Sequence, residues 1–150
     1  MRWVLVWKTT PDEKKAKARL VVKGFTDPDL IKLRAEAPTL SKAGRHLLLQ
    51  LGVSNRFRFE VGDVKTAFLQ GDKTETERDV YLEPTREIRE RLGFTEKQIL
   101  RLLGSAYGLR TAPRSWYLRV KADLESLGWR MHQMEPCVFL STMTKGKILS

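Results

Sequence analysis

The chain has 150 residues, and its 28 Lys and Arg against 18 Asp and Glu give a formal net charge of +10. This length fits one domain with a packed core. The hydrophobic content of 41% argues against disorder. No apolar run reaches the ~18 residues of a membrane span. The single cysteine excludes an internal disulfide and argues against a structural zinc site, and the N-terminus lacks a secretion signal, so we expect an intracellular protein, cytoplasmic or nuclear.

Positive charge is concentrated at the two ends of the chain. Residues 1–50 carry 11 basic and 5 acidic side chains, residues 51–100 carry 9 and 10, and residues 101–150 carry 8 and 3. This balance favours a polyanionic partner, most simply nucleic acid. If the basic ends meet in space, they line a cationic groove around a near-neutral centre; the alternative is a solvated basic surface with no specific partner.

The N-terminal segment predicts a β-hairpin. Residues 3–7 and 20–22 are rich in β-branched and aromatic side chains, which is typical of strands, and a turn at 9–13 joins them. Four basic side chains then lie near the tip or along one face of the hairpin: Lys14, Lys15, Lys17 and Arg19.

A helix and a strand follow. Ser41 is suited to an N-cap, leucines recur at helical spacing and Gly52 is suited to the end, so a helix is predicted over residues 41–51. Residues 57–61 alternate Phe or Val with Arg or Glu, and this period of two predicts a half-buried strand.

The second half mixes short strands with helices. We predict a strand at 80–82, helical pieces between residues 86 and 103, and the clearest helix at 113–127, which starts with proline and carries an apolar stripe. A strand at 137–140 precedes a tight turn, and a further strand begins at residue 148.

Asp63 is the main candidate for chemistry. It follows the alternating segment and precedes an Ala-Phe-Leu cluster, where a carboxylate should be desolvated unless it is paired or metal-bound. It could cap a helical turn, or it could bind Mg²⁺, which is usually held by one or two carboxylates together with substrate phosphates. The neighbouring acidic residues are more typical of a solvated rim: Asp72, Glu75, Glu77 and Asp79.

Four segments, in this order, carry a family resemblance. They are Trp3-Val4 with Lys8 and KARLVVKGF at 17–25, DVKTAFLQG at 63–71, VYLEP at 80–84, and YGLRTAPRSWY at 107–117. Together they resemble the fingers segment, the first catalytic motif, the following tyrosine-bearing strand and the YGLKQAPRxWY block of Ty1/copia-type retrotransposon reverse transcriptases.

The resemblance implies roles for residues 63–68. Asp63 would be the first catalytic, metal-binding aspartate, and the backbone carbonyl of Val64 would complete the coordination of the second of two Mg²⁺ ions. The backbone amides of Thr66 and Ala67 would face the incoming triphosphate. Phe68 would be the steric gate against a 2′-hydroxyl, with an ordinary core phenylalanine as the alternative.

The resemblance also implies contacts to nucleotide and nucleic acid. Tyr107 and Gly108 would flank the nucleotide and the template base, although Gly108 also fits a simple turn before a helix. Arg110 and Arg114 would reach template or primer phosphates. Three hairpin cations are candidates for the β- and γ-phosphates, with a merely solvated hairpin as the alternative: Lys8, Lys17 and Arg19.

The implied fold is α+β, with a fingers-like part over about residues 1–56 and a palm-like part over about 57–150 that includes interleaved fingers elements. Palm strands near 57–63 and 137–150 would form an antiparallel sheet with helices packed on one face. The second metal motif of the family, Tyr/Phe-x-Asp-Asp, does not occur in the sequence. We therefore expect the fold to stop before the second catalytic hairpin strand and the chain to be inactive alone.

The implied activity is that of an RNA-directed DNA polymerase from a copia-like retrotransposon Pol polyprotein, which catalyses two-metal nucleotidyl transfer. The expected partners are an RNA or DNA template-primer, deoxynucleoside triphosphates and the remainder of the polyprotein, with the rest of the palm, the thumb and RNase H; no membrane partner is expected. The alternative is a non-catalytic, basic nucleic-acid-binding fragment or a decayed retroelement remnant.

Overall fold

The computed structural model describes residues 1–11, 13–71 and 79–141. Over these residues the chain contains three α-helices, two short 3₁₀ helices and three separate two-stranded antiparallel sheets. The predicted α+β class is therefore confirmed. Within the same ranges, no helix is both long enough and apolar enough to cross a membrane.

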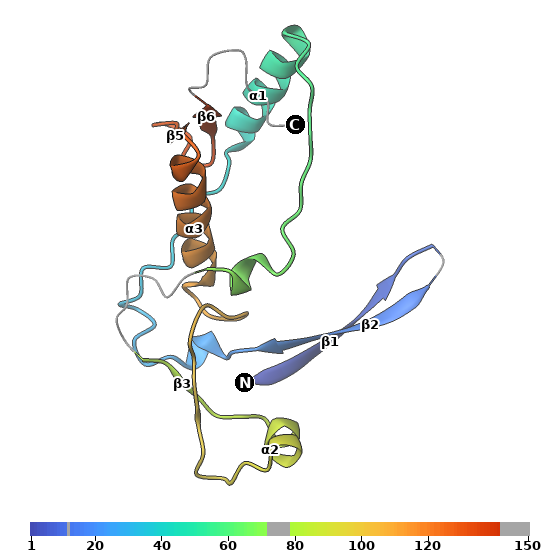
Figure 1. Ribbon diagram of the computed structural model, residues 1–150, viewed down its shortest axis with the longest axis vertical. Helices are drawn as coiled ribbons and strands as arrows, with labels where there is room; N and C mark the ends of the chain where they lie inside the picture. The colour runs from blue at the N-terminus through green and yellow to red at the C-terminus, as the bar shows by residue number, and fades with distance from the viewer. Residues whose placement is uncertain (12, 72–78, 142–150) are drawn as a thin grey trace.

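The elements are spread along an elongated molecule (Figure 1). The hairpin of β1 (Arg2–Thr9) and β2 (Lys14–Val21) projects sideways as an arm. Helix α1 (Lys42–Ser54) lies at one end of the long axis and α2 (Arg86–Leu92) at the other, while α3 (Ala112–Ser126) runs between the arm and the α1 end.

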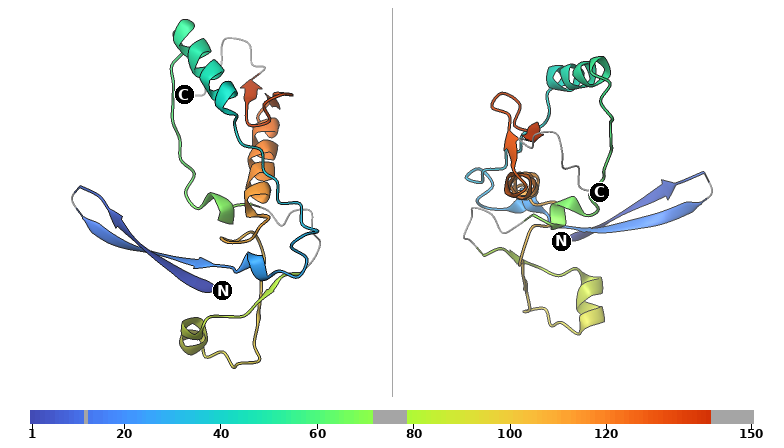
Figure 2. Two further views of the ribbon diagram at one scale, coloured as in Figure 1. Left: turned by 180° about the vertical axis from the view of Figure 1, so that it is seen from behind. Right: turned by 45° about the horizontal axis from the view of Figure 1, so that its top comes forward.

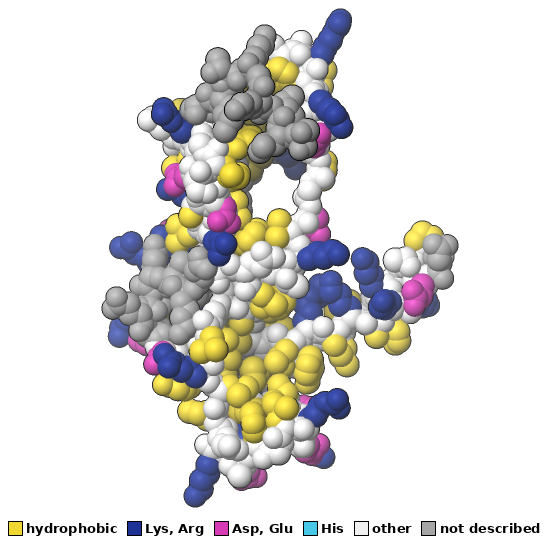
Figure 3. Space-filling model, in the orientation of Figure 1, with side chains coloured by type: hydrophobic (Ala, Val, Ile, Leu, Met, Phe, Trp, Pro, Cys, Tyr) yellow, Lys and Arg dark blue, Asp and Glu magenta, His cyan; other side chains and the backbone are white. Residues whose placement is uncertain are grey.

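The predicted hairpin is confirmed, and it is longer than the sequence suggested. Its strands pair without interruption from Arg2 opposite Val21 to Thr9 opposite Lys14. Because side chains alternate between the faces of a strand, this register separates the hairpin into an apolar and a basic face. The apolar face carries Trp3, Leu5, Trp7, Ala16, Ala18 and Leu20, with Lys14 at its tip, and the basic face carries Arg2, Lys8, Lys15, Lys17 and Arg19 among Val4, Val6 and Val21. Figure 3 shows basic side chains along one side of the arm and apolar ones along the other.

Helix α1 confirms the helix predicted at 41–51 and continues three residues further. Ser41 is the N-cap, and its Oγ accepts a hydrogen bond from the backbone N–H of Gly44 at 2.9 Å. The same hydroxyl donates a short hydrogen bond to Glu135, whose other carboxylate oxygen accepts from the backbone N–H of Ser41 at 3.3 Å. The start of α1 is thereby tied to a segment 94 residues later in the chain.

The strand prediction at 57–61 is wrong. No described residue pairs with this segment, and a single strand without a hydrogen-bonded neighbour is not stable as sheet. Its apolar side chains are consequently exposed, Phe57 by 63% and Val61 by 99%. The ring of Phe59 packs closely on Gly52 of α1. A Cβ placed on Gly52 would lie 2.1 Å from this ring.

The middle of the chain forms a small sheet around α2. Strand β3 (Tyr81–Leu82) confirms the prediction at 80–82 and pairs with β4 (Leu100–Arg101). Helix α2 confirms the first of the predicted helical pieces, but the second is wrong. The N–H of Thr95 donates to the side chain of Gln98 at 2.7 Å, as in a capping box, yet it closes a turn that leads into β4.

Helix α3 confirms the helix predicted at 113–127, with Pro113 in its first turn. Two strands follow it, β5 (Trp129–Met131), which was not predicted, and β6 (Phe139–Ser141), which overlaps the strand predicted at 137–140. They pair with each other from Trp129 opposite Ser141 to Met131 opposite Phe139. The predicted turn at 144–147 and the strand from residue 148 lie outside the described residues.

The predicted antiparallel sheet between residues 57–63 and 137–150 is not formed over the described part of the chain. There, β6 takes β5 as its partner, and residues 57–63 have none. Helix α3 packs against β5 and against the 3₁₀ turn η2 (Ala67–Leu69). The expected packing of several helices on one face of a palm sheet is thus reduced to α3 alone.

The packed core is smaller than the length of the chain predicts. The accessible surface is 12843 Å², whereas a compact monomer of this mass exposes about 7,800 Å² by the usual scaling. Among the described residues, the buried apolar side chains are Val22, Pro84 and Ala112, and Ser115 is the buried polar one. Val22, Ala112 and Ser115 lie where β2 ends and α3 begins, so the best-packed part of the molecule adjoins the site described next.

Candidate functional site

A groove of about 830 Å³ lies between the base of the hairpin, the segment before η2 and the loop before α3. Figure 2 shows these three segments side by side from two further directions. The groove brings together seven of the site residues predicted from the sequence. They are Lys8, Lys17, Arg19, Asp63, Val64, Thr66 and Tyr107.

The basic side of the groove comes from the hairpin. Lys8, Lys17 and Arg19 line it, and none of them forms an ion pair within the described ranges. Lys8 stands directly opposite Lys15 on the paired strand, and like charges in that position destabilise a hairpin.

A fourth cation, Lys65, lines the groove and was missed by the sequence reasoning. The signal available was its place two residues after Asp63, within the motif itself. The described basic residues of the last third do not join it. Arg110 is exposed and does not line the groove, and Arg114 donates to the backbone carbonyl of Glu36 at 3.2 Å. Of the two arrangements left open by the charge distribution, a groove lined by both basic ends is not formed by the described residues, where the hairpin and Lys65 supply the cations.

Asp63 is the one acidic residue among the described residues that line the groove. Its side chain is exposed, so the expected desolvation of its carboxylate is wrong. The reason is the unpaired segment at 57–61, which carries Asp63 along the surface of the molecule instead of along a buried sheet. Val64 lines the groove beside it.

Thr66 turns the chain from this open segment into η2. Its φ is 54° and its ψ is 31°, a left-handed conformation that costs a β-branched residue roughly 1–2 kcal/mol. Two hydrogen bonds hold the bend. The backbone N–H of Leu69 donates to the carbonyl of Thr66 at 2.8 Å, and the side-chain amide of Gln70 donates to the carbonyl of Lys65 at 2.8 Å. Thr66 lines the groove and Ala67 does not.

Two predicted aromatic residues meet beside the groove. The rings of Phe68 and Tyr107 are 6.2 Å apart between centroids and inclined at 81°, an edge-to-face contact. Tyr107 lines the groove, whereas Phe68, with 38% of its surface exposed, does not. This exposure does not separate a gate from an ordinary core phenylalanine, because no large side chain in the described residues is fully buried.

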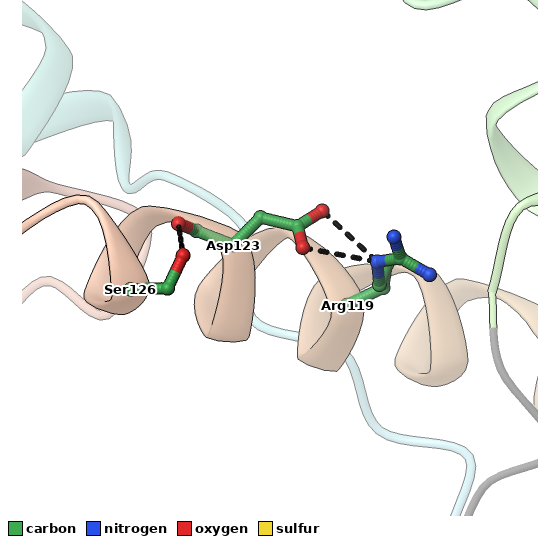
Figure 4. Close-up of polar contacts among 3 residues, drawn as sticks. All are labelled: Arg119, Asp123 and Ser126. Atoms are coloured by element: carbon green, nitrogen blue, oxygen red, sulfur yellow. Dashed lines mark hydrogen bonds and ion pairs between the residues drawn. The ribbon is translucent and has the colours of Figure 1, made fainter.

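Helix α3 supports this region through its first turn. A Cβ placed on Gly71 would lie 2.9 Å from the Cβ of the buried Ser115, so the segment after η2 packs closely on the helix. The later turns of α3 expose one side to solvent. Figure 4 shows Arg119 donating to both carboxylate oxygens of Asp123, at 3.1 and 3.0 Å, while the hydroxyl of Ser126 donates to the carbonyl of Asp123 at 2.7 Å.

The donor set limits what the groove can hold. The described residues contain no cluster of three or more His, Cys, Asp or Glu side chains. One carboxylate, Asp63, together with the backbone of Val64, fits a single Mg²⁺ that shares its coordination with triphosphate oxygens, and does not by itself fit two ions. Of the predicted acidic rim, Asp79 pairs with Arg101 at 2.8 Å, and the others lie outside the described residues: Asp72, Glu75 and Glu77.

Comparison with known proteins identifies relatives over the whole chain. A family described as reverse transcriptase (RNA-dependent DNA polymerase) matches residues 1–150. The chain is 30% identical, over 99% of its length and 11% of the relative, to the retrovirus-related Pol polyprotein from transposon TNT 1-94 of Nicotiana tabacum. It is 30% identical, over 85% and 9%, to the retrovirus-related Pol polyprotein from transposon RE2 of Arabidopsis thaliana.

A more distant relative is the transposon Ty1-BL Gag-Pol polyprotein of Saccharomyces cerevisiae, 27% identical over 85% of this chain and 8% of the relative. The chain thus spans 11% or less of the length of these three curated relatives. No solved structure matches it.

Proposed function

The chain belongs to the reverse transcriptase family of Ty1/copia-type retrotransposons, and we propose that its groove binds the incoming deoxynucleoside triphosphate during RNA-directed DNA synthesis. The observation that carries the proposal is the composition of the groove. Three hairpin cations, one exposed carboxylate and one aromatic side chain converge on it from three separate segments. A metal-bound nucleoside triphosphate needs cations for its phosphates, a carboxylate for its metal ion and an aromatic ring for its base or sugar.

Each side of the groove has a task in the proposed reaction. The hairpin cations, Lys8, Lys17 and Arg19, neutralise the β- and γ-phosphates, whose negative charge grows as pyrophosphate leaves. Asp63, with the carbonyl of Val64, holds the divalent ion, which supplies charge neutralisation where the primer 3′-hydroxyl attacks the α-phosphorus.

The remaining predicted residues act on the base and sugar side. Tyr107 contacts the base or sugar, and Phe68, whose ring contacts that of Tyr107, is the gate that excludes a 2′-hydroxyl. The backbone amides of Thr66 and Ala67 face phosphate oxygens, a use that the left-handed turn at Thr66 supports because it exposes this part of the backbone. Gly108 does not line the groove, because the carbonyl oxygen of Val22 occupies its open side, so its part is to bring the loop of Tyr107 against the hairpin. Arg110 binds template or primer phosphates. Arg114 has the same role, in addition to its hydrogen bond to the backbone carbonyl of Glu36.

The same proposal divides the chain by role. Residues 1–56 are the fingers-like part, and the projecting β1–β2 arm with its basic face supports this (Figure 1). Residues 57–150 are the palm-like part with interleaved fingers elements, and the place of Asp63 and Tyr107 on the same groove supports it. The natural partners are an RNA or DNA template-primer and the rest of a Pol polyprotein.

Titration with dATP in the presence of Mg²⁺ tests the proposal directly. Lys17→Ala and Arg19→Ala each remove one charge-assisted phosphate contact and should weaken binding by roughly five- to tenfold. Lys97→Ala, a lysine outside the groove, is the matched control and should bind like the wild type. Equal affinity of all three variants would reject the groove as the triphosphate site.

We propose further that this chain alone does not extend a primer, because two ions in the family reaction need more than one carboxylate and the sequence contains no Asp-Asp pair. The assay is Mg²⁺-dependent extension of a primer on an RNA template. Extension by the chain that disappears in Asp63→Ala would contradict this part of the proposal and leave the binding role intact.

A further inference from the structure

The hairpin is joined to the loop before α3 by an unusually close backbone contact. Immediately after β2, the N–H of Val22 donates to the carbonyl of Tyr107 at 2.7 Å. Two residues later, a Cβ placed on Gly24 would lie 2.2 Å from the carbonyl oxygen of Gly108 and 3.2 Å from the backbone N of Arg110. Both obstacles are main-chain atoms, so a side chain at Gly24 requires one backbone to move.

The approach is equally tight from the other side. A Cβ placed on Gly108 would lie 2.1 Å from the carbonyl oxygen of Val22, and the φ of Gly108 is +87°, a conformation that favours glycine. Gly104, four residues earlier, is different, because nothing lies within 4 Å of the corresponding position. We call the contact formed by Val22, Gly24, Tyr107 and Gly108 the glycine clasp.

The clasp joins the two sides of the groove. Arg19 and Lys17 lie three and five residues before Val22 on the hairpin side, and Tyr107 with its partner Phe68 lies on the other side. Val22 is buried, with 9% of its surface exposed, so the joint is shielded from water, where its hydrogen bond is stronger. Another hydrogen bond at the hairpin base, from the amine of Met1 to the carbonyl of Glu83, is longer at 3.4 Å.

We propose that Gly24 is a positioning residue: through the clasp, it sets the spacing between the hairpin cations and Tyr107, so that one triphosphate nucleotide reaches both sides of the groove at once. The inference rests on the proposed nucleotide-binding function. A nucleotide held by both sides gains from the fixed spacing, whereas a ligand held by one side does not.

The experiment compares dATP and dAMP binding to Gly24→Ala, with Gly104→Ala as the control and circular dichroism to check folding. Gly24→Ala should weaken dATP by about tenfold and dAMP by less than twofold, because dAMP lacks the β- and γ-phosphates that the hairpin side holds. Gly104→Ala should leave both affinities unchanged. Unchanged dATP binding, or equal loss for both nucleotides, would overturn the positioning role.

Two further measurements separate failure of the inference from failure of the proposed function. Amide exchange of Val22 should accelerate in Gly24→Ala and not in Gly104→Ala; unchanged exchange would overturn the clasp itself. Replacing Val22 by its α-hydroxy acid analogue removes the N–H donor without adding an atom, and should repeat the selective loss of dATP even if Gly24→Ala does not fold. A wild-type chain that does not bind dATP, with exchange as predicted, would reject the proposed function and retain the clasp.

Discussion

The ring of Phe68 is held in place by its edge-to-face contact with Tyr107, so that its position relative to the groove is defined. Removing the ring in Phe68→Ala should reduce the preference for dATP over ATP at least fivefold, because the space for a 2′-hydroxyl is no longer blocked. Competition binding of the two nucleotides measures it. Phe57→Ala, which removes an exposed ring outside the groove, should keep the wild-type preference. Equal preference in both variants would remove Phe68 from the proposed gate.

Two partly buried groups, Tyr117 of α3 and Cys137 in the loop before β6, give stability a dependence on alkaline pH. Burial raises the pKa of Tyr117 above its usual 10.0, with a contribution from Cys137, and burial followed by the charge of Glu135 raises the pKa of Cys137 above its usual 9.0. The folded state therefore keeps these protons more tightly than the unfolded state. Their contribution to stability is complete below pH 9.0 and is lost as pH rises through the folded pKa values.

Denaturant unfolding at pH 8 and at increasing pH above 9.0 measures this loss. Cys137→Ala should show a smaller decrease in the free energy of unfolding between these conditions than the wild type does, because one of the two titrating groups is absent. An identical decrease in the variant and the wild type would show that Cys137 does not contribute.

At the scale of elements, α1 depends on its N-cap more than a packed helix does. No other helix or strand packs extensively along it in the described part of the chain, and Leu47 is 61% exposed. Ser41→Ala removes the bond to Gly44 and the link to Glu135, and should lower the free energy of unfolding by about 1 kcal/mol or more. Thermal unfolding followed by circular dichroism tests this. The control is Ser54→Ala at the other end of the helix, which should cost less; equal losses would argue against the cap.

Helices were predicted better than strands because their signals are local. Ser41, Pro113 and Gly128 mark helix ends within a few residues of sequence, whereas Gly52, the predicted end of α1, lies inside the helix, which continues to Ser54. Strands depend on a partner elsewhere. The alternation at 57–61 is as regular as that of a paired strand, yet no described segment pairs with it, whereas Leu100 becomes a strand because Leu82 lies opposite.

In the site, too, features carried by a local sequence motif were predicted, and features that depend on distant segments were not. The resemblance identified Lys8, Asp63 and Tyr107 as members of one site, and the groove contains all three. The contact between Gly24 and Gly108 was not predictable, because it depends on how closely two backbones approach, which no residue pattern records. The exposure of Asp63 was also unpredictable, since it follows from the missing partner of residues 57–61.

For the whole molecule, an accessible surface of 12843 Å² and few buried side chains leave the groove as the best-organised feature. The arm, the Asp63 segment and the loop before α3 contribute to it, and the buried residues Val22 and Ala112 lie next to it or in the helix that supports it. Binding of a triphosphate should therefore stabilise the arrangement of these segments by mass action.

The most direct test of this account is the effect of Asp63→Asn on dATP affinity with and without Mg²⁺, with Glu96→Gln as a control for the loss of one negative charge outside the groove. In EDTA, the carboxylate of Asp63 repels the triphosphate, so the variant should bind dATP more tightly than the wild type, by about threefold. In Mg²⁺, the carboxylate shares the ion with the triphosphate, so the variant should bind about tenfold more weakly. An effect of the same sign in both conditions, or none in either, would contradict the claim that this groove holds the metal-bound triphosphate.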